Sequence, residues 1–303
     1  INAGGAVFDV WRENGTLYAY LDFSAGTVVV SNSVFKNELS RYIVTSSGTT
    51  AYQAFLTDCS FLNPTGMATA VTLAHAGNIE RCFFGIGNVN PSRDTVLLSL
   101  TAPTGLTNTV ANCTFSRNPA TAYGNKRKAL NIGSTNGVYK VSFCSLVGFA
   151  GSEGAVKLSS TTASSTQFRG CVFAENGQRT SGVLTTPIDI YNAVLGVENC
   201  CFMAPESKLT IVSGGTTANN LFSTDPKLQA LADNDGLLLP DSSHLQTYAF
   251  LPTQSPLRNA GGTLAIASTD ARGLPRPDRV SNLADIGAYE YQPTVWGTLI
   301  KVQ

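Results

Sequence analysis

A short phrase recurs seven times along the chain, and this repetition constrains the fold more than any other feature. The phrase places a small residue, usually cysteine, two positions before an aromatic residue, as in TDCSFLN at 57–63 and ANCTFSRN at 111–118. The anchor residues of the seven copies lie 26, 23, 31, 31, 27 and 29 residues apart; they are Ser33, Cys59, Cys82, Cys113, Cys144, Cys171 and Cys200. A constant phrase at irregular intervals indicates one fixed element joined by loops of varying length.

The phrase itself has the pattern of a β-strand. The cysteine and the aromatic residue two positions later lie on one face of an extended chain, and the residue between them lies on the other. Further strand-like stretches separated by turn-forming residues lie between the copies, at 41–46, 69–75, 94–100, 128–134, 154–160 and 187–193. The one short helical pattern is at 225–233. Each repeat therefore contributes two or three short strands.

These features predict an all-β chain folded as a right-handed single-stranded parallel β-helix, a solenoid of about seven or eight coils. Leucine-rich repeats are more uniform in length, and propeller blades have about 40 or more residues per unit. The right hand follows from the general preference of parallel crossover connections. The repeat ends near residue 221, so we expect β-helix coils over 1–221 and a C-terminal capping segment, continuous with the helix, over 222–303.

Stacked coils place equivalent residues above one another. We therefore expect a ladder of buried cysteines beside a ladder of phenylalanines, and the residues are Cys59, Cys82, Cys113, Cys144, Cys171 and Cys200, with Phe35, Phe61, Phe84, Phe115, Phe173 and Phe202. Leu146 replaces the phenylalanine in the fifth copy, and Cys201 is expected to point outward. Free cysteine packs as a small apolar residue. A disulfide framework and a metal or catalytic thiol are the alternatives; the odd count of seven cysteines favours the ladder.

Asparagine often follows the phrase. The residues are Asn37, Asn63, Asn88, Asn118 and Asn176. Asparagine tolerates left-handed backbone and bonds to neighbouring peptide groups, so these positions predict a recurring turn. Ligand binding by these amides is the alternative.

Composition excludes several functions. Only 13% of the residues are charged, and twenty basic residues balance twenty acidic ones, so the basic excess of a nucleic-acid-binding protein is absent. No apolar run approaches the ~20 residues of a membrane-spanning helix. Polar but uncharged residues must therefore supply most of the surface.

The last eighty residues carry four more specific phrases. These are Asp225-Pro226-Lys227-Leu228, the stretch from Leu251 to Gly261, Asp270 to Arg276 (DARGLPR) and Asp285 to Glu290 (DIGAYE). They resemble the closing segment of bacterial secreted and surface β-helix proteins of the choice-of-anchor Q type. Arg258-Asn259 stands where that family typically has Ile-Asp. The resemblance implies a secreted, surface-associated protein without a defined catalytic activity.

Within these phrases, Arg272 and Arg276 are expected to pair with Asp270, Asp285 or Glu290, because a guanidinium group suits a carboxylate. We expect this latch to cover the open edge of the last coil. A calcium site formed by Asp270, Asp285 and Glu290 is one alternative, since calcium prefers oxygen ligands. A catalytic acid pair is the other.

No catalytic constellation is evident elsewhere. A glycosidase needs two carboxylates about 5–9.5 Å apart. The acidic residues of the coils each stand in a separate phrase; they are Asp58, Glu80, Glu153, Glu175, Asp189 and Glu198. The two histidines, His75 and His244, occupy unrelated contexts, and Lys126, Arg127 and Lys128 form one basic loop. We therefore predict that the chain is not an enzyme and needs no cofactor, apart from the calcium alternative.

The sequence favours an extracellular, cell-surface protein with a structural or adhesive role, self-assembling into filaments or a surface layer. Its expected partners are other copies of itself or extracellular polysaccharide; no nucleic acid and no membrane span is expected. Residues 1–20 and 293–303 are the predicted assembly contacts. The alternative is a carbohydrate-binding module, or a polysaccharide lyase or glycoside hydrolase. Tyr52, Tyr123, Tyr139 and Tyr191 are candidates for stacking on sugars, or for lateral packing.

Overall fold

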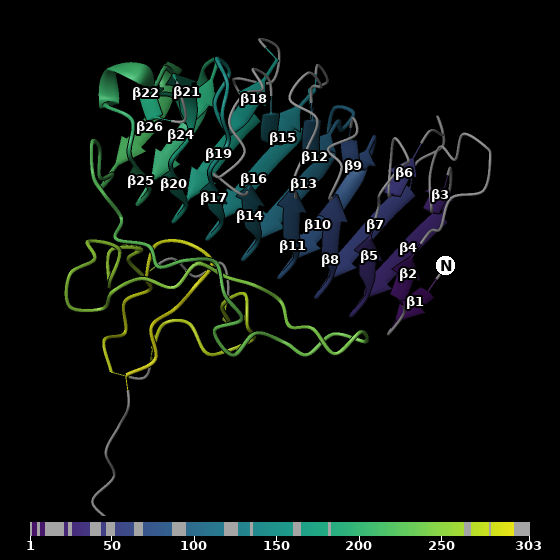
Figure 1. Ribbon diagram of the computed structural model, residues 1–303. Helices are drawn as coiled ribbons and strands as arrows, with labels where there is room; N and C mark the ends of the chain where they lie inside the picture. Colours follow the sequence, from purple (N-terminus) through teal and green to yellow (C-terminus); the bar gives the residue numbers. More distant parts are fainter. Residues whose placement is uncertain are drawn as a thin grey trace, which may run out of the picture.

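Short parallel strands form nearly all the regular structure in the part of the chain that the structure describes. The computed structural model describes residues 2–4, 7–9, 21–23, 26–36, 44–46, 52–63, 69–86, 95–117, 127–133, 136–159, 165–180, 183–263, 268–278 and 280–293. The predicted stretches 1–20 and 293–303 fall largely outside these ranges, as do Tyr123 and Lys126. The described chain winds through three parallel sheets, here called A, B and C, and each turn adds one strand to each sheet in succession (Figure 1).

The three sheets contain nine, eight and seven strands. Sheet A consists of β1 (Asn2–Gly4), β4 (Gly26–Ser31), β7 (Tyr52–Thr57), β10 (Ala76–Glu80), β13 (Thr107–Ala111), β16 (Val138–Ser142), β19 (Thr166–Arg169), β24 (Val194–Glu198) and β26 (Ile211–Ala218). Sheet B consists of β2 (Val7–Asp9), β5 (Val34–Lys36), β8 (Ser60–Asn63), β11 (Phe83–Ile86), β14 (Thr114–Arg117), β17 (Ser145–Val147), β20 (Val172–Ala174) and β25 (Cys201–Phe202). Sheet C consists of β3 (Leu21–Phe23), β6 (Val44–Ser46), β9 (Thr69–Leu73), β12 (Thr95–Leu100), β15 (Arg127–Ile132), β18 (Val156–Leu158) and β23 (Ile190–Tyr191).

Within the described residues, a hairpin and a 3-10 turn lie outside these sheets. The antiparallel hairpin of β21 (Gly177–Thr180) and β22 (Val183–Pro187) interrupts one coil, and a 3-10 turn, η2, spans Glu206–Lys208. The prediction of a parallel β-helix is confirmed, and the strand-like stretches predicted between the phrases form sheet C. The helical pattern at 225–233 is not a helix: Leu228 and Ala232 make isolated bridges with Phe250 and Thr247.

The recurring phrase is the corner between sheets A and B. The residue before each anchor has a positive φ of 44° to 61°, and these residues are Asn32, Asp58, Arg81, Asn112, Phe143, Gly170 and Asn199. Five of the seven are Asn, Asp or Gly, the residue types that adopt left-handed backbone most readily. The left-handed turn thus precedes the cysteine, whereas the sequence pattern suggested one after the phenylalanine. Of the trailing asparagines, Asn37, Asn88 and Asn118 fall outside the described residues.

Cysteines and phenylalanines stack inside the solenoid. All seven cysteines are buried free thiols, and each of the six anchor sulfurs lies 3.2–3.4 Å from the carbonyl oxygen two residues earlier. The rings of Phe35, Phe61, Phe84 and Phe115 stack in order with centroids 5.0, 4.9 and 4.7 Å apart. Leu146 interrupts the column, which resumes with Phe173, Phe202 and Phe222 at 4.8 and 5.2 Å. Each buried ring contributes about 1.5–3 kcal/mol to the stability of the core.

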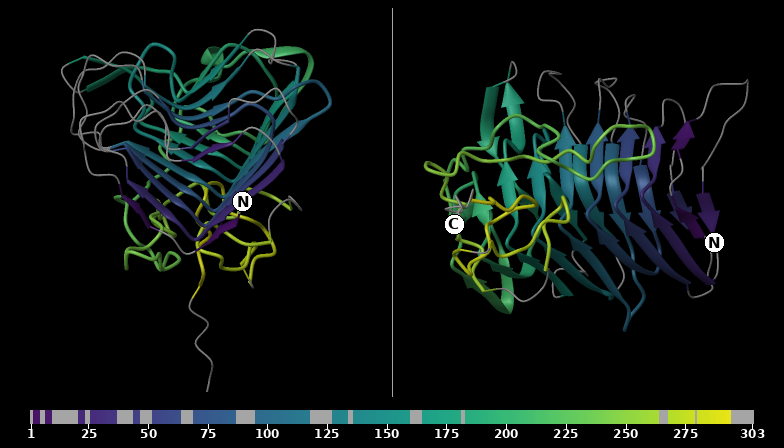
Figure 2. Two further views of the ribbon diagram at one scale, coloured as in Figure 1. Left: turned by 90° about the vertical axis from the view of Figure 1, so that its right-hand side faces the viewer. Right: turned by 90° about the horizontal axis from the view of Figure 1, so that it is seen from below.

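Most of the C-terminal segment lies against the side of the solenoid, so the prediction that its latch covers the last coil's edge is wrong. It runs along the outer face of sheet B, opposite the interior (Figures 1 and 2). The reason is that sheet B carries outward apolar side chains that require cover: Val34 and Phe83 pack with Leu239 and Leu245. Leu209, Ile211 and Phe222 pack against the end of the core instead.

Cys201 also lies on the outer face of sheet B, beneath the C-terminal segment. It points out of the interior, as expected, but is fully buried between sheet B and the C-terminal segment. There it packs with Val172, Phe250, Leu257 and Ile286. The outer face of sheet B is therefore a second core, and the outer faces of sheets A and C remain for other interactions.

Candidate functional site

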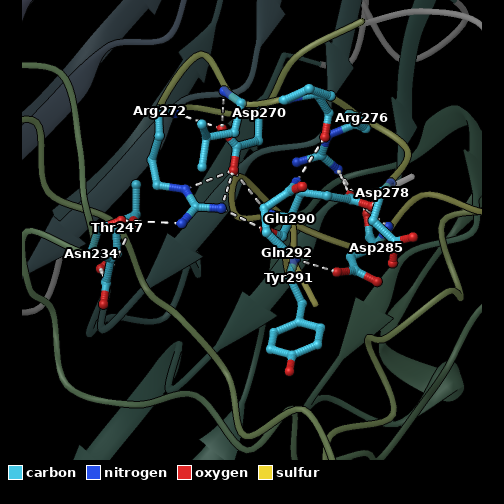
Figure 3. A network of polar contacts seen from close by, with 12 residues as sticks. Asn234, Thr247, Asp270, Arg272, Arg276, Asp278, Asp285, Glu290, Tyr291 and Gln292 are labelled. Carbon is cyan, nitrogen blue, oxygen red and sulfur yellow. Dashed lines mark hydrogen bonds and ion pairs between the residues drawn. The ribbon is translucent and has the colours of Figure 1, made fainter. Parts of the chain in front are cut away.

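The latch of the C-terminal segment is one of two regions where polar residues gather (Figure 3). Arg272 and Asp270 form a buried ion pair, with Nη2 2.7 Å and Nε 2.8 Å from Oδ2. The other carboxylate oxygen of Asp270 accepts the backbone N–H groups of Arg272 and Leu274 at 2.8 and 3.0 Å. Arg272 also donates to the carbonyl oxygen of Asn234 at 3.1 Å and lies over the ring of Tyr289. This pair ties three stretches of the segment together.

Arg276 connects the segment to the solenoid. Its Nη1 and Nη2 donate to the carbonyl oxygens of Asp285 and Gly287 at 2.8 and 2.9 Å, and its Nη1 lies 3.5 Å from Oε2 of Glu290. Its guanidinium carbon lies 4.3 Å from the ring centroid of Phe143 at a corner of the solenoid. The expected latch partners are thus brought together.

The carboxylates of Asp285 and Glu290 are acceptors for backbone N–H groups. Asp285 accepts from Asn259 and Tyr291 at 2.6 and 2.7 Å, and Glu290 accepts from Asp278 and Asp285 at 3.0 and 2.9 Å. Burial raises the pKa of Glu290 to about 7, against the opposing effect of Arg276, and burial also raises the pKa of Asp285. These hydrogen bonds hold the surrounding loops in place.

The calcium alternative finds no assembled ligand set. Among the residues that the structure describes, no three His, Cys, Asp or Glu side chains lie close enough to hold a metal ion together. The oxygens of Asp270, Asp285 and Glu290 face N–H donors, which occupy the positions that a cation would need. These contacts indicate a structural role for the latch.

The acidic residues of the coils are mostly neutralised by neighbouring cations. Arg81 binds Asp58 through Nε at 2.7 Å and Nη2 at 2.9 Å, and Glu80 through Nη1 at 3.0 Å. Glu153 lies 2.6 Å from both Lys128 and Lys157. Glu175 pairs with Arg179 and Glu198 pairs with Arg169 at 2.7 and 2.9 Å. A carboxylate held in this way does not act readily as an acid or base.

Asp189 is the exception. It lies directly before β23 of sheet C, where the N–H groups of Ala155 and Val156 both donate to its carbonyl oxygen. Ala155, directly before β18 one coil earlier, accepts the N–H groups of Ala129 and Leu130 in the same way, and the side chain of Asp189 is buried. It accepts from Nδ2 of Asn176 at 2.9 Å and from the N–H of Ala204 at 3.2 Å, and burial raises its pKa to about 6. Asn176 is thus a buried structural residue.

Two of the candidate tyrosines are interior packing residues. Tyr52 and Tyr139 are buried, and their hydroxyl groups accept backbone N–H groups of residues that follow sheet C strands. Tyr52 accepts from Ala74 and from His75 at 3.0 Å, and Tyr139 accepts from Ala102 at 2.8 Å. His75 packs edge-on against Tyr52. His244 pairs with Asp233 in the C-terminal segment. Only Tyr191, 41% exposed on sheet C, is available for stacking among the described candidates.

The second polar region is a groove on the outer face of sheet A. It has a volume of about 460 Å³ and is lined by Asn78, Glu80, Thr109, Ala111, Lys140, Val141, Ser142, Gln167 and Arg169. The strands β10, β13, β16 and β19 run side by side beneath it. Their register forms two outward rows, Asn78–Thr109–Lys140–Gln167 and Glu80–Ala111–Ser142–Arg169. The small side chains of Ala111 and Ser142 leave the groove between the longer ones.

Hydrogen-bonding groups and charges line this groove. The hydroxyl of Thr109 donates to Oδ1 of Asn78 at 2.6 Å. Glu80 at one end is held by Arg81, and Arg169 at the other end donates through Nε to Glu198 at 2.9 Å. Glu80 and Arg169 are three strand steps apart, or about 14 Å between their Cα atoms. The groove is therefore an elongated polar surface with opposite charges at its ends.

The groove was missed from the sequence although a signal was present. The row from Asn78 to Gln167 lies four residues before the anchor cysteine in four successive coils, and the row from Glu80 to Arg169 lies two residues before it. An alignment of the repeats on the cysteines would have predicted both rows.

Comparison of the chain with protein-family models, with curated proteins and with solved structures finds no significant match. The resemblance of the C-terminal phrases to the choice-of-anchor Q type stays a prediction. Within the described ranges, the structure has no helix of the length and apolar character needed to cross a membrane.

Proposed function

We propose that this chain is a non-enzymatic adhesive solenoid that binds an extended polysaccharide along the outer face of sheet A. The observation that carries the proposal is the groove, in which side chains from four successive coils present hydrogen-bonding groups in register. Parallel strands repeat every ~4.8 Å, so the surface offers a regular series of polar groups to a regular polymer.

The chemistry of the groove suits sugars better than an apolar ligand. Asn78 and Gln167 carry amides that both donate and accept, and Thr109 and Ser142 carry hydroxyl groups. Sugar hydroxyls need such two-way partners when they leave water. Two small residues on the floor allow a flat ring to approach the sheet.

The charges in the groove favour binding over hydrolysis. Of the described residues that line it, Glu80 alone carries a carboxylate, and this is bound by Arg81 at 3.0 Å. Glycoside hydrolysis with two carboxylates requires a second group about 5–9.5 Å away. A lyase or hydrolase acting at this groove is the alternative, and it predicts cleavage of the bound polymer.

The proposal includes an extracellular or cell-surface location, a bacterial source and association with further copies of the chain. The location and the source rest on the resemblance of the C-terminal phrases. The formal net charge of zero supports association with further copies, because a chain without net charge associates readily.

A glycan array with a variant that fills the groove tests the proposal. Ala111→Trp places a large ring on the groove floor without touching the interior, and we expect it to abolish binding of any polysaccharide that the native protein binds. Ser99→Trp makes the matched change on the outer face of sheet C and should leave binding intact. Equal binding by both variants would exclude the groove, and shortening of the polymer would support the enzymatic alternative.

A further inference from the structure

The lysine at the centre of the groove, Lys140, indicates which class of ligand the groove binds. Lys140 is exposed in the middle of β16, between Thr109 and Gln167 in the outward row. The described part of the chain provides no ion-pair partner for its ammonium group, whereas the neighbouring charges Glu80 and Arg169 are both paired. Among the described charged residues of sheet A, Lys140 is thus the one whose charge is left available for a ligand.

Arg169 adds a second positive charge close to Lys140. It lies on the next strand, diagonally adjacent to Lys140, because Lys140 pairs with Gln167 and Arg169 pairs with Ser142. Their Cα atoms are about 8 Å apart by strand spacing and rise, within reach of two long side chains converging on one group. Glu198 engages one of the five N–H donors of Arg169 through Nε.

We propose that the groove selects an anionic polysaccharide, with one acidic group of the polymer bound by Lys140 and Arg169. This inference rests on the proposed function and adds the ligand class to it. The Asn78 and Thr109 end then receives sugar hydroxyls, and Glu80 disfavours a second acidic group there. The shared chemistry is an anionic oxygen group on a sugar, either a carboxylate or a sulfate.

Direct binding to matched polymers tests the inference. The probes are polygalacturonate against its methyl-esterified form, and dextran sulfate against dextran, so that each pair differs in charge but shares a backbone. We expect binding of at least one charged polymer and at least tenfold weaker binding of its neutral partner, as a charge-assisted hydrogen bond of about 1.5–3 kcal/mol implies. Which charged polymer binds distinguishes carboxylate from sulfate. Binding should weaken as salt rises, because the cation is exposed.

Substitutions test whether Lys140 causes the preference for a charged polymer. Lys140→Gln should weaken binding of the charged polymer at least tenfold, and Lys140→Arg should largely retain it. Lys157→Gln, which removes a lysine from the outer face of sheet C, should have no effect. Equal binding of charged and neutral polymers, or unchanged affinity in Lys140→Gln, would overturn the charge inference and leave the groove proposal standing. No binding to any polymer here or on the array would overturn both.

Discussion

Arg276 lies over the ring of Phe143, with its guanidinium carbon 4.3 Å from the ring centroid, and this contact joins the C-terminal segment to a corner of the solenoid. Phe143 holds a left-handed backbone with φ of 50° and is fully buried. The equivalent residue of the next coil is Gly170, where a Cβ atom would lie 2.7 Å from the Phe143 ring. The glycine therefore makes room for the ring that Arg276 covers.

Replacement of Arg276 should loosen this junction. Arg276→Ala leaves Glu290 buried without its guanidinium partner, and breaking a buried pair in this way costs about 3–5 kcal/mol. Urea unfolding measures the loss. Arg258→Ala is the control, because Arg258 is exposed over Tyr291 at 4.9 Å and its removal should cost less than about 1 kcal/mol. Equal costs for the two variants would contradict the assignment of Arg276 as the connecting residue.

Cys201 should report on the same junction. Its thiol is buried beneath the C-terminal segment, and burial raises its pKa to about 12. We expect no thiol of the native protein to react promptly with a thiol reagent, and all seven to react in denaturant. In Arg276→Ala, Cys201 should react before Cys113, which lies in the interior. Mass spectrometry of labelled peptides gives the order, and simultaneous labelling of both would mean that the segment and solenoid open together.

The phenylalanine column offers a graded test of packing. Phe84 is fully buried and stacks on Phe61 and Phe115. Phe84→Ala should destabilise the protein by about 3–5 kcal/mol. Phe84→Leu should cost less than about 1.5 kcal/mol, because Leu146 already fills the equivalent position of another coil. Urea unfolding of both variants measures the difference, and similar losses would mean that the ring stacking matters more than the filled volume.

Asp189 should make stability fall as pH rises. Burial raises its pKa from 3.8 to about 6, so the folded chain retains a proton that the unfolded chain releases between these values. The contribution is fully present below about pH 3.8 and is lost as pH rises through 6. At about 1.4 kcal/mol per pKa unit, the change is about 3 kcal/mol. Urea unfolding from pH 4 to 8 measures this slope.

The matched variant for this slope is Asp189→Asn, which cannot titrate and should lack this part of the dependence. The variant must be compared with the native protein, because other groups change stability with pH in the opposite direction. Lys227 holds the pKa of Asp225 low, so Asp225 adds stability as pH rises. Parallel pH profiles for the two proteins would show that folding does not raise the pKa of Asp189.

The repeated phrase was sufficient to predict the solenoid, because stacking of coils requires equivalent residues at equivalent positions, and the period is visible without any structure. The cysteine and phenylalanine positions follow from the same argument. The groove on sheet A could have been predicted in part: Asn78, Thr109, Lys140 and Gln167 share one place relative to the anchor cysteines. Their exposure, and the absence of an ion-pair partner for Lys140 in the described chain, depend on neighbouring side chains.

What the chain alone determined is the local repeat: the left-handed corner, the inward ladder and the alternation of each strand are consequences of near neighbours and one period. What only the tertiary structure decided is the position of the C-terminal segment. Its charged residues could pair among themselves at either the end or the side of the solenoid. The outcome depends on which face needs cover, and that face is assembled from residues such as Val34, Phe83 and Val172, which become neighbours of the segment only after the coils have stacked.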